Sequence, residues 1–226
     1  MKQCVFTYIF GKNKEVLRDP LIIDDNVEYI CVTDQNDLKS NVWKIIYDPL
    51  PTIESLRDKV ALVKFNPFKY TDADEILIQD SSLQICASVK QLFELLKNDD
   101  ILLKKHPEVS DLTTELWRWV RLRKMPKCQV DKFEKMAKID SVCLNKIPVY
   151  ECCVLCIKND EMTRNLFSTL LKLMKILGDG HNMIMTQQCT FAYILATGKL
   201  NLKIGLINQR NYFTRFYHNC NKVHTL

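Results

Sequence analysis

Short apolar runs alternate with amphipathic stretches along most of this chain. Alternating residues rich in β-branched and aromatic side chains predict strands at 4–9, 28–33, 43–47, 75–79 and 149–157. Apolar residues at helical spacing predict helices at 56–65, 88–96, 113–123, 130–139, 161–177 and 187–197, with Ser88 as the N-cap of the second. Strands that alternate with helices predict an α/β fold with a mixed, mostly parallel sheet flanked by helices, whose N-terminal half is Rossmann-like.

Length and composition fit one domain with an appended segment. The chain has 226 residues, of which 47% are hydrophobic and 26% charged, as in ordinary globular proteins. Only 5 Gly and 7 Pro are present, so no stretch has the composition of a linker. We therefore expect a single domain over residues 1–198 and a C-terminal segment over 199–226.

The C-terminal segment is basic and aromatic. Between 199 and 226 it has no acidic residue, and its basic residues are Lys199, Lys203, Arg210, Arg215 and Lys222. Aromatic residues at 212, 213, 216 and 217 lie among them. Three interpretations stay open: a solvated tail, a cationic flap over an anionic ligand, or a patch for nucleic acid. Five basic residues are few for a nucleic-acid surface, so we expect no nucleic-acid partner.

The hydrophobic pattern also indicates where in the cell the protein is expected. The apolar stretch at 5–10 ends at Lys12 and Lys14 and is shorter than the apolar region of a secretory signal. Nowhere do about 18 apolar residues follow one another, as a membrane-spanning helix would require. We therefore expect a cytoplasmic protein with no integral membrane segment.

Ten cysteines raise the question of a metal centre. Cys152, Cys153 and Cys156 cluster, but no second Cys or His pair lies at the spacing of a zinc ribbon or finger. The surrounding residues, 150–157, are those of a buried strand, in which free Cys acts as a small apolar side chain. We interpret these residues as buried thiols.

A carboxylate and two hydroxyls follow the most apolar of the predicted strands. Residues 75–79 lead directly into Asp80, Ser81 and Ser82. A carboxylate there is costly to desolvate unless it is paired or bound to a cation, and a divalent cation held by a carboxylate and phosphate oxygens is usual for nucleotide substrates. The alternative is a turn or helix cap formed by Asp80. Gly11 and Asp34 also end predicted strands, and ligands bind at the carboxyl ends of parallel strands.

The order of short motifs resembles a GT-A glycosyltransferase. The chain reads Thr-Tyr-Ile-Phe-Gly at 7–11, Asp-Pro at 19–20, Tyr-Ile-Cys-Val-Thr-Asp at 29–34 and Trp-Lys-Ile at 43–45, and Arg57, Lys64 and Pro67 precede the Asp80 strand. Later blocks are Lys-His-Pro at 105–107, Pro-Val-Tyr-Glu at 148–151 and Thr-Gln-Gln at 186–188. In particular, the chain is similar to the small glycosyltransferase-like domains, formerly of unknown function, of bacterial polysaccharide loci and plant wall proteins.

This resemblance implies transfer of a sugar from a nucleoside diphosphate sugar, UDP-linked, to an acceptor hydroxyl of a saccharide or glycoconjugate, with Mn²⁺ or Mg²⁺ as cofactor. By position, the nucleotide-sugar contacts would be Thr7, Gly11, Asp34, Lys64, Asp80, Ser82 and His106. The metal ligands would be Asp80, Ser82 and His218. The catalytic residues would be Glu151, Gln187 and Gln188, with Glu151 as the candidate base.

Two departures from the family pattern open an alternative. Ser82 stands where the acidic motif has a second Asp, and Gln187 stands where a later block has an Asp. The alternative is a catalytically inactive domain that binds a nucleotide-sugar. Single residues also have structural interpretations: Asp34 as a turn cap, His106 as a surface residue, and Gln187 and Gln188 as helix-capping residues. Trp117 and Trp119 cannot share one helix face, which leaves one of them for the surface or a sugar pocket.

Overall fold

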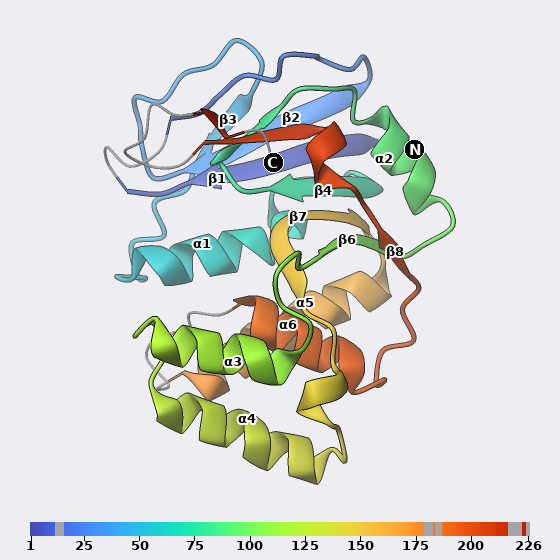
Figure 1. Ribbon diagram of the computed structural model, residues 1–226. Helices are drawn as coiled ribbons and strands as arrows, with labels where there is room; N and C mark the ends of the chain where they lie inside the picture. Colours follow the sequence, from blue (N-terminus) through green and yellow to red (C-terminus); the bar gives the residue numbers. More distant parts are fainter. Residues whose placement is uncertain (12–15, 179–182, 184–186, 217–222, 225–226) are drawn as a thin grey trace.

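A seven-stranded sheet forms the centre of the computed structural model, which describes residues 1–11, 16–178, 183, 187–216 and 223–224 (Figure 1). The strands are, in spatial order, β3 (Lys44–Tyr47), β2 (Val27–Thr33), β1 (Gln3–Ile9), β4 (Glu75–Gln79), β7 (Tyr150–Lys158), β6 (Ile101–Lys105) and β8 (Ile204–Leu206). The pairs β1–β2, β2–β3, β1–β4 and β6–β8 are parallel, whereas β7 runs antiparallel to both of its neighbours. The predicted mixed, mostly parallel sheet is confirmed.

The predicted helices are all present; α5 has the predicted ends, and the ends of the others differ by one to three residues. They are α1 (Leu56–Lys64), α2 (Lys90–Leu96), α3 (Leu112–Arg121), α4 (Lys127–Ile139), α5 (Glu161–Leu177) and α6 (Gln187–Ala196). Side chains cap three of them in the usual way, since Ser55, Asp111 and Asp160 each accept a hydrogen bond from a backbone N–H in the first turn.

The predicted N-cap of α2 is wrong. The cap position is Val89, which makes no side-chain capping bond. The Ser88 hydroxyl donates instead to Asp24 Oδ1 at 2.6 Å, and Asp24 Oδ2 accepts the Val89 N–H at 2.7 Å. The Ser88 hydroxyl oxygen also accepts the Lys90 N–H at 3.4 Å. Asp24, 65 residues from Val89 along the chain, thus satisfies the N–H just before the helix.

Alternate residues of the central strands pack on opposite faces of the sheet. On β4, Ile76 and Ile78 join the cluster that contains α1, α3, α4, α5 and α6. Leu77, between them, joins a second cluster with Phe93 of α2. In Figure 1, α3 to α6 are grouped in the lower part of the molecule, beneath β6 and β7, while β1 to β3 lie at the top. The sheet is therefore covered on both faces, as the apolar strands predicted.

Part of the C-terminal segment belongs to these sheets. β8 pairs with β6 at the edge of the main sheet, and β9 (Phe213–Phe216) pairs with β5 (Leu83–Ile85) in a smaller sheet that also contains β10 (Val223–His224). Phe213 is 2% exposed and packs in the α2 cluster. The division of the chain at residue 198 stays a prediction, and Tyr217, His218 and Lys222 lie outside the described residues.

We predict that Phe213→Ala destabilises the protein by about 3–5 kcal/mol, because removing a buried aromatic ring loses its transfer free energy and leaves a cavity. The measurement is urea unfolding followed by circular dichroism. The matched control is Leu206→Ala, also in the C-terminal segment but 61% exposed, where we expect a change within about 0.5 kcal/mol. Equally small losses in both variants would mean that β9 contributes nothing to the core.

Candidate active site

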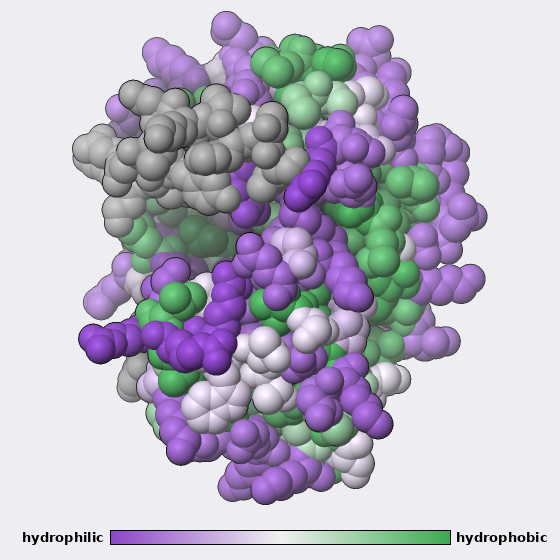
Figure 2. Space-filling model, in the orientation of Figure 1, coloured by the Kyte–Doolittle hydropathy of each residue, from purple (hydrophilic) through white to green (hydrophobic). Residues whose placement is uncertain are grey.

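A cavity of about 930 Å³ lies where β4, β6 and β7 meet α3 and α6. Hydrophilic residues are concentrated across the middle of the face shown in Figure 2, between the strands above and the helices below. Six basic side chains and three acidic ones line the cavity: Lys64, Lys104, Lys105, Arg118, Arg210 and Arg215, against Asp80, Glu108 and Glu151. A cavity with this surplus of positive charge suits an anionic ligand.

An irregularity in the sheet forms the floor of the cavity. Leu103 of β6 pairs with Leu155 of β7, yet the next residue, Lys104, pairs with Glu151. Cys152 and Cys153, which fall between these two pairs, have no partner on β6 and line the cavity. A bulge of this kind redirects side chains, and here it brings Lys104 and Glu151 together at the cavity.

The first ion pair of the site joins α1 to the end of β4. Lys64 Nζ lies 2.8 Å from Asp80 Oδ1, and the Lys64 side chain is only 4% exposed whereas that of Asp80 is 34% exposed. Burial alone would lower the pKa of Lys64, but the charge and hydrogen bond of Asp80 outweigh it and raise that pKa. The Tyr8 hydroxyl donates to the same oxygen of Asp80. Lys64 is therefore a fixed buried cation at the cavity.

The second ion pair joins β6 to β7. Lys104 Nζ lies 2.7 Å from Glu151 Oε2, and both side chains are 14% exposed. Burial raises the pKa of Glu151, but the hydrogen bond and charge of Lys104 outweigh it, and the net pKa lies below the ordinary value of 4.5. Glu151 is therefore ionised at neutral pH.

Gln209 supplies an unpaired donor beside this second pair. Its side chain is fully buried and lines the cavity, and its Oε1 accepts the Cys153 thiol at 3.3 Å. Its Nε2 has no hydrogen-bond partner among the described residues, and a buried donor left unpaired is costly. Burial raises the pKa of Cys153 to about 12, so this thiol stays protonated and does not act as a nucleophile at neutral pH.

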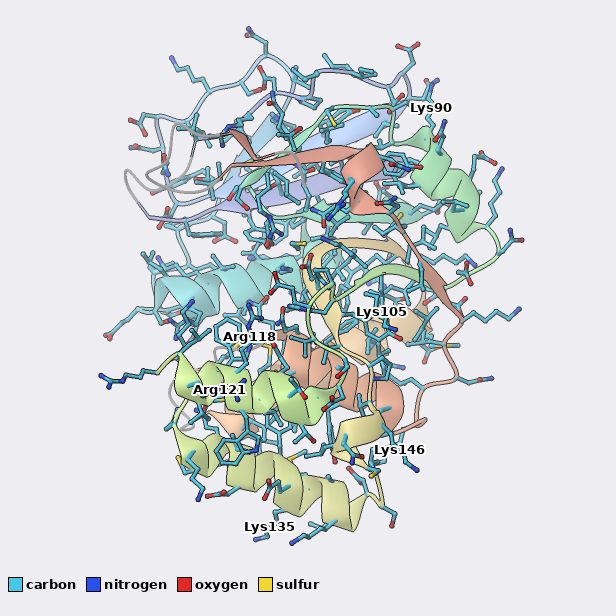
Figure 3. The ribbon with its side chains drawn as sticks, viewed as in Figure 1. Lys90, Lys105, Arg118, Arg121, Lys135 and Lys146 are labelled. Atoms are coloured by element: carbon cyan, nitrogen blue, oxygen red, sulfur yellow. The ribbon has the colours of Figure 1, made fainter. Side chains whose placement is uncertain are left out.

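The opposite wall comes from the loop after β6 and from α3 and α6. His106 Nδ1 accepts the N–H groups of Glu108 and Val109 at 3.2 and 3.1 Å, which fixes the turn at Pro107. Its Nε2 lies 3.4 Å from Arg118 Nη1. Figure 3 shows Lys105 and Arg118 in the band between the strands and the lower helices, whereas Lys135 and Lys146 lie lower, away from it.

The predicted site residues fall into two groups. Lys64, Asp80, His106, Glu151, Gln187 and Gln188 line the cavity together. Thr7, Gly11, Asp34 and Ser82 do not. The Thr7 hydroxyl donates to the Gln79 carbonyl within the sheet at 3.0 Å, and Gly11, with φ of 87°, donates its N–H to Asp34 Oδ1 at 2.9 Å. Nucleotide contacts at these four positions stay predictions.

A divalent cation does not fit the described residues of the Asp80 motif. Asp80 is a single carboxylate whose Oδ1 is already engaged by the Lys64 ammonium and the Tyr8 hydroxyl, and Ser82 supplies no charge. Across the described part of the chain, no three His, Cys, Asp or Glu side chains group as metal ligands. The third predicted ligand, His218, lies outside the described residues. The metal requirement stays a prediction.

Sequence reasoning missed several residues of the cavity, notably Lys104, Arg118 and Gln209. The first of these had a usable signal: three apolar residues from Ile101 are followed by two lysines and His-Pro, which is the pattern of a strand that ends at a ligand-binding edge. The others reach the cavity only through contacts between distant parts of the chain.

The fold is that of a GT-A-like domain, as comparison with solved structures shows. The apo form of the glycosyltransferase GlyE of Streptococcus pneumoniae TIGR4 aligns with a TM-score of 0.50 at 11% identity, over 93% of this chain and 46% of the GlyE chain. Mouse xyloside xylosyltransferase 1, also in its apo form, aligns with a TM-score of 0.50 at 10% identity, over 92% of this chain and 85% of its own. This chain thus spans about half the length of GlyE. At these identities the likeness concerns the fold.

No protein family model matches the chain, and no curated protein is similar to it in sequence. The resemblance to the small glycosyltransferase-like domain group therefore stays a prediction. Among the described helices, none is long and apolar enough to cross a membrane.

We predict that the ion pair between Glu151 and Lys104 raises the free energy of unfolding at neutral pH and that this contribution is lost in acid. Because the folded pKa of Glu151 is below 4.5, the pair's contribution is complete above that value and is lost as the pH falls through the folded pKa. Glu151→Gln should cost about 1.5–3 kcal/mol at pH 7, and its deficit relative to the parent should shrink in acid. Urea unfolding at several pH values measures both.

Glu151→Gln leaves Lys104 without its partner, so Lys104→Met and the double variant complete a cycle that isolates the pair. If the parent and Glu151→Gln lose stability in parallel as the pH falls, the pair does not exist in solution.

Proposed function

We propose that this chain is a glycosyltransferase that moves a sugar from a nucleoside diphosphate sugar, UDP-linked, to a hydroxyl of a saccharide or glycoconjugate acceptor. One observation carries the proposal. In a GT-A-like fold, a cavity at the carboxyl end of β4 holds a buried cation, Lys64, and an ionised carboxylate, Glu151. Cleavage of the bond between the sugar and a diphosphate needs both kinds of charge.

The cations suit the leaving group. As the glycosidic bond breaks, negative charge builds on the departing diphosphate, and fixed positive groups that are already desolvated stabilise it without reorganising. Lys64 is held in place by Asp80, and Arg215, on β9, lines the same cavity. In this proposal these two side chains contact the diphosphate, and Asp80 keeps the Lys64 ammonium oriented.

The carboxylate suits the sugar and the acceptor. Positive charge develops on the sugar carbon in an oxocarbenium-like transition state, and ionised Glu151 is the cavity carboxylate opposite the Asp80 pair. In this proposal Glu151 stabilises that charge and takes the proton of the acceptor hydroxyl as it attacks. Its low pKa makes it a modest base, so we expect the electrostatic part of its role to be the larger.

The second candidate function is binding of a nucleotide-sugar without transfer. The observation that favours it is the pairing of both Asp80 and Glu151 with lysines. The resemblance adds that Ser82 and Gln187 stand where its motifs would have acids. A cavity whose carboxylates are already neutralised can hold a ligand and yet lack a free base. Binding without turnover of any offered donor and acceptor would support this candidate.

We predict that UDP raises the melting temperature of the parent protein, because a ligand that binds only the folded state stabilises it by mass action. Lys64→Met should weaken UDP binding by about tenfold or more, since a buried charge contact is worth more than about 1.4 kcal/mol. Calorimetric titration gives both dissociation constants. Lys69→Met is the matched control, because Lys69 also pairs with an aspartate, at 2.6 Å, but does not line the cavity.

Unchanged UDP affinity in Lys64→Met would place the diphosphate elsewhere, and the absence of any UDP binding by the parent would contradict the proposed function.

The same titrations in manganese and in EDTA test the metal prediction. A stronger affinity in manganese that disappears in Asp80→Asn would confirm it, and equal affinities in the two buffers would make it wrong.

A further inference from the structure

A buried carboxylate outside the cavity holds one of its walls. Glu115, on α3, is fully buried and does not line the cavity. Its Oε1 accepts Trp119 Nε1 at 2.6 Å and also the side-chain amide of Gln188, and its Oε2 accepts Arg118 Nη1 at 3.2 Å. All three donors line the cavity. Glu115 thus holds three residues of the cavity wall together from one buried position behind it.

The chemistry of Glu115 determines how the Gln188 amide is turned. The Glu115 carboxylate accepts from the Arg118 guanidinium group and from the Trp119 indole N–H, which can only donate. Gln188 must therefore direct its NH₂ group toward Glu115, which turns its carbonyl oxygen away from that carboxylate. A glutamine without such a partner could present either end of its amide. Glu115 removes this freedom, although Gln188 lies 73 residues away along the chain.

The wall carries less positive charge than the rest of the cavity. Arg118 is flanked by Glu115 at 3.2 Å and by Glu108 at 3.6 Å, so its charge is balanced. A fixed carbonyl oxygen, a fixed guanidinium group and an indole ring together match an uncharged sugar, whose hydroxyl groups both donate and accept and whose C–H face packs on an aromatic ring. We therefore place the phosphates of the nucleotide-sugar beside Lys64, in the more positively charged part of the cavity.

We propose that Glu115 is the positioning residue of the donor-sugar subsite: by fixing Gln188, Arg118 and Trp119 it presents a defined set of hydrogen-bonding groups to the sugar of the nucleotide-sugar. The inference rests on the proposed function. Glu115 itself touches no substrate and acts through Gln188.

The test compares the affinities for UDP and for UDP-sugars. UDP-glucose, UDP-galactose and UDP-xylose are titrated into the parent, and the one that binds tightest is kept. Glu115→Gln has the same shape but can donate as well as accept, so the Gln188 amide is free to turn. We expect it to weaken binding of that UDP-sugar, and any hydrolysis of it, by about tenfold, with UDP affinity unchanged. Glu94→Gln, which removes a carboxylate from the exposed pair with Lys97 and does not line the cavity, should change both affinities less than twofold.

A double-variant cycle separates positioning from a purely structural role. Gln188→Leu should lose the same sugar-dependent affinity, and Glu115→Gln combined with Gln188→Leu should be no worse than Gln188→Leu alone, because the two residues act as one unit. Additive losses would overturn the proposal. If Glu115→Gln does not fold, Glu115→Asp, which keeps the carboxylate but shortens its reach to Gln188, takes its place in the cycle with Gln188→Leu under the same criterion.

The outcomes distinguish this inference from the function on which it rests. If the parent binds neither UDP nor a UDP-sugar, the proposed function is wrong. If the parent binds them and Glu115→Gln keeps the UDP-sugar affinity, the function stands and the role of Glu115 is wrong. A loss of UDP and UDP-sugar affinity by the same factor would show a general structural role, which also overturns the inference.

Discussion

The contact between Lys64 and Asp80 is the interaction on which the arrangement of the site depends. An ammonium group that is 96% removed from solvent is costly unless an opposite charge satisfies it, so α1 and the end of β4 have to meet at this point. The Asp80 backbone N–H then donates to the Cys153 carbonyl at 2.9 Å, which ties the same residue to β7. One helix and two strands are thereby held around a single aspartate, and the cavity opens beside it.

The site combines two kinds of rigidity. Along β6 and β7 the charges of Lys104 and Glu151 lie on strands, where the bulge sets their direction. Along α3 and α6 the polar groups are held by buried Glu115. In both arrangements, side chains of the protein itself hold the polar groups in place, which lowers the entropy that binding of a ligand would cost.

Local patterns were enough to predict the fold but not most of the cavity. The strand that ends at Asp80 and the long α5 helix were predicted with the bounds that the structure has, because an apolar run and a helical period are properties of neighbouring residues. Lys64, Asp80 and Glu151 were placed in the site by order and spacing. Glu115 and Gln209 were not, because the contacts with Gln188 and Cys153 that connect them to the site join parts of the chain far apart in sequence. A buried glutamate within a helix looks, in the sequence, like any exposed one.

The edge pairing of β8 has a consequence for how the molecule folds. β6 pairs with β8 across about a hundred residues, from Ile101 to Ile204, and β5 pairs with β9 across an even longer interval, from Leu83 to Arg215. During synthesis on the ribosome, β1 to β4 can assemble as soon as they emerge, whereas the edges that adjoin the cavity wait for the last strands. Such long loops slow the final step. A nascent chain would therefore leave β5 and the outer edge of β6 unpaired until the last strands arrive, and that interval is when a chaperone would be most needed.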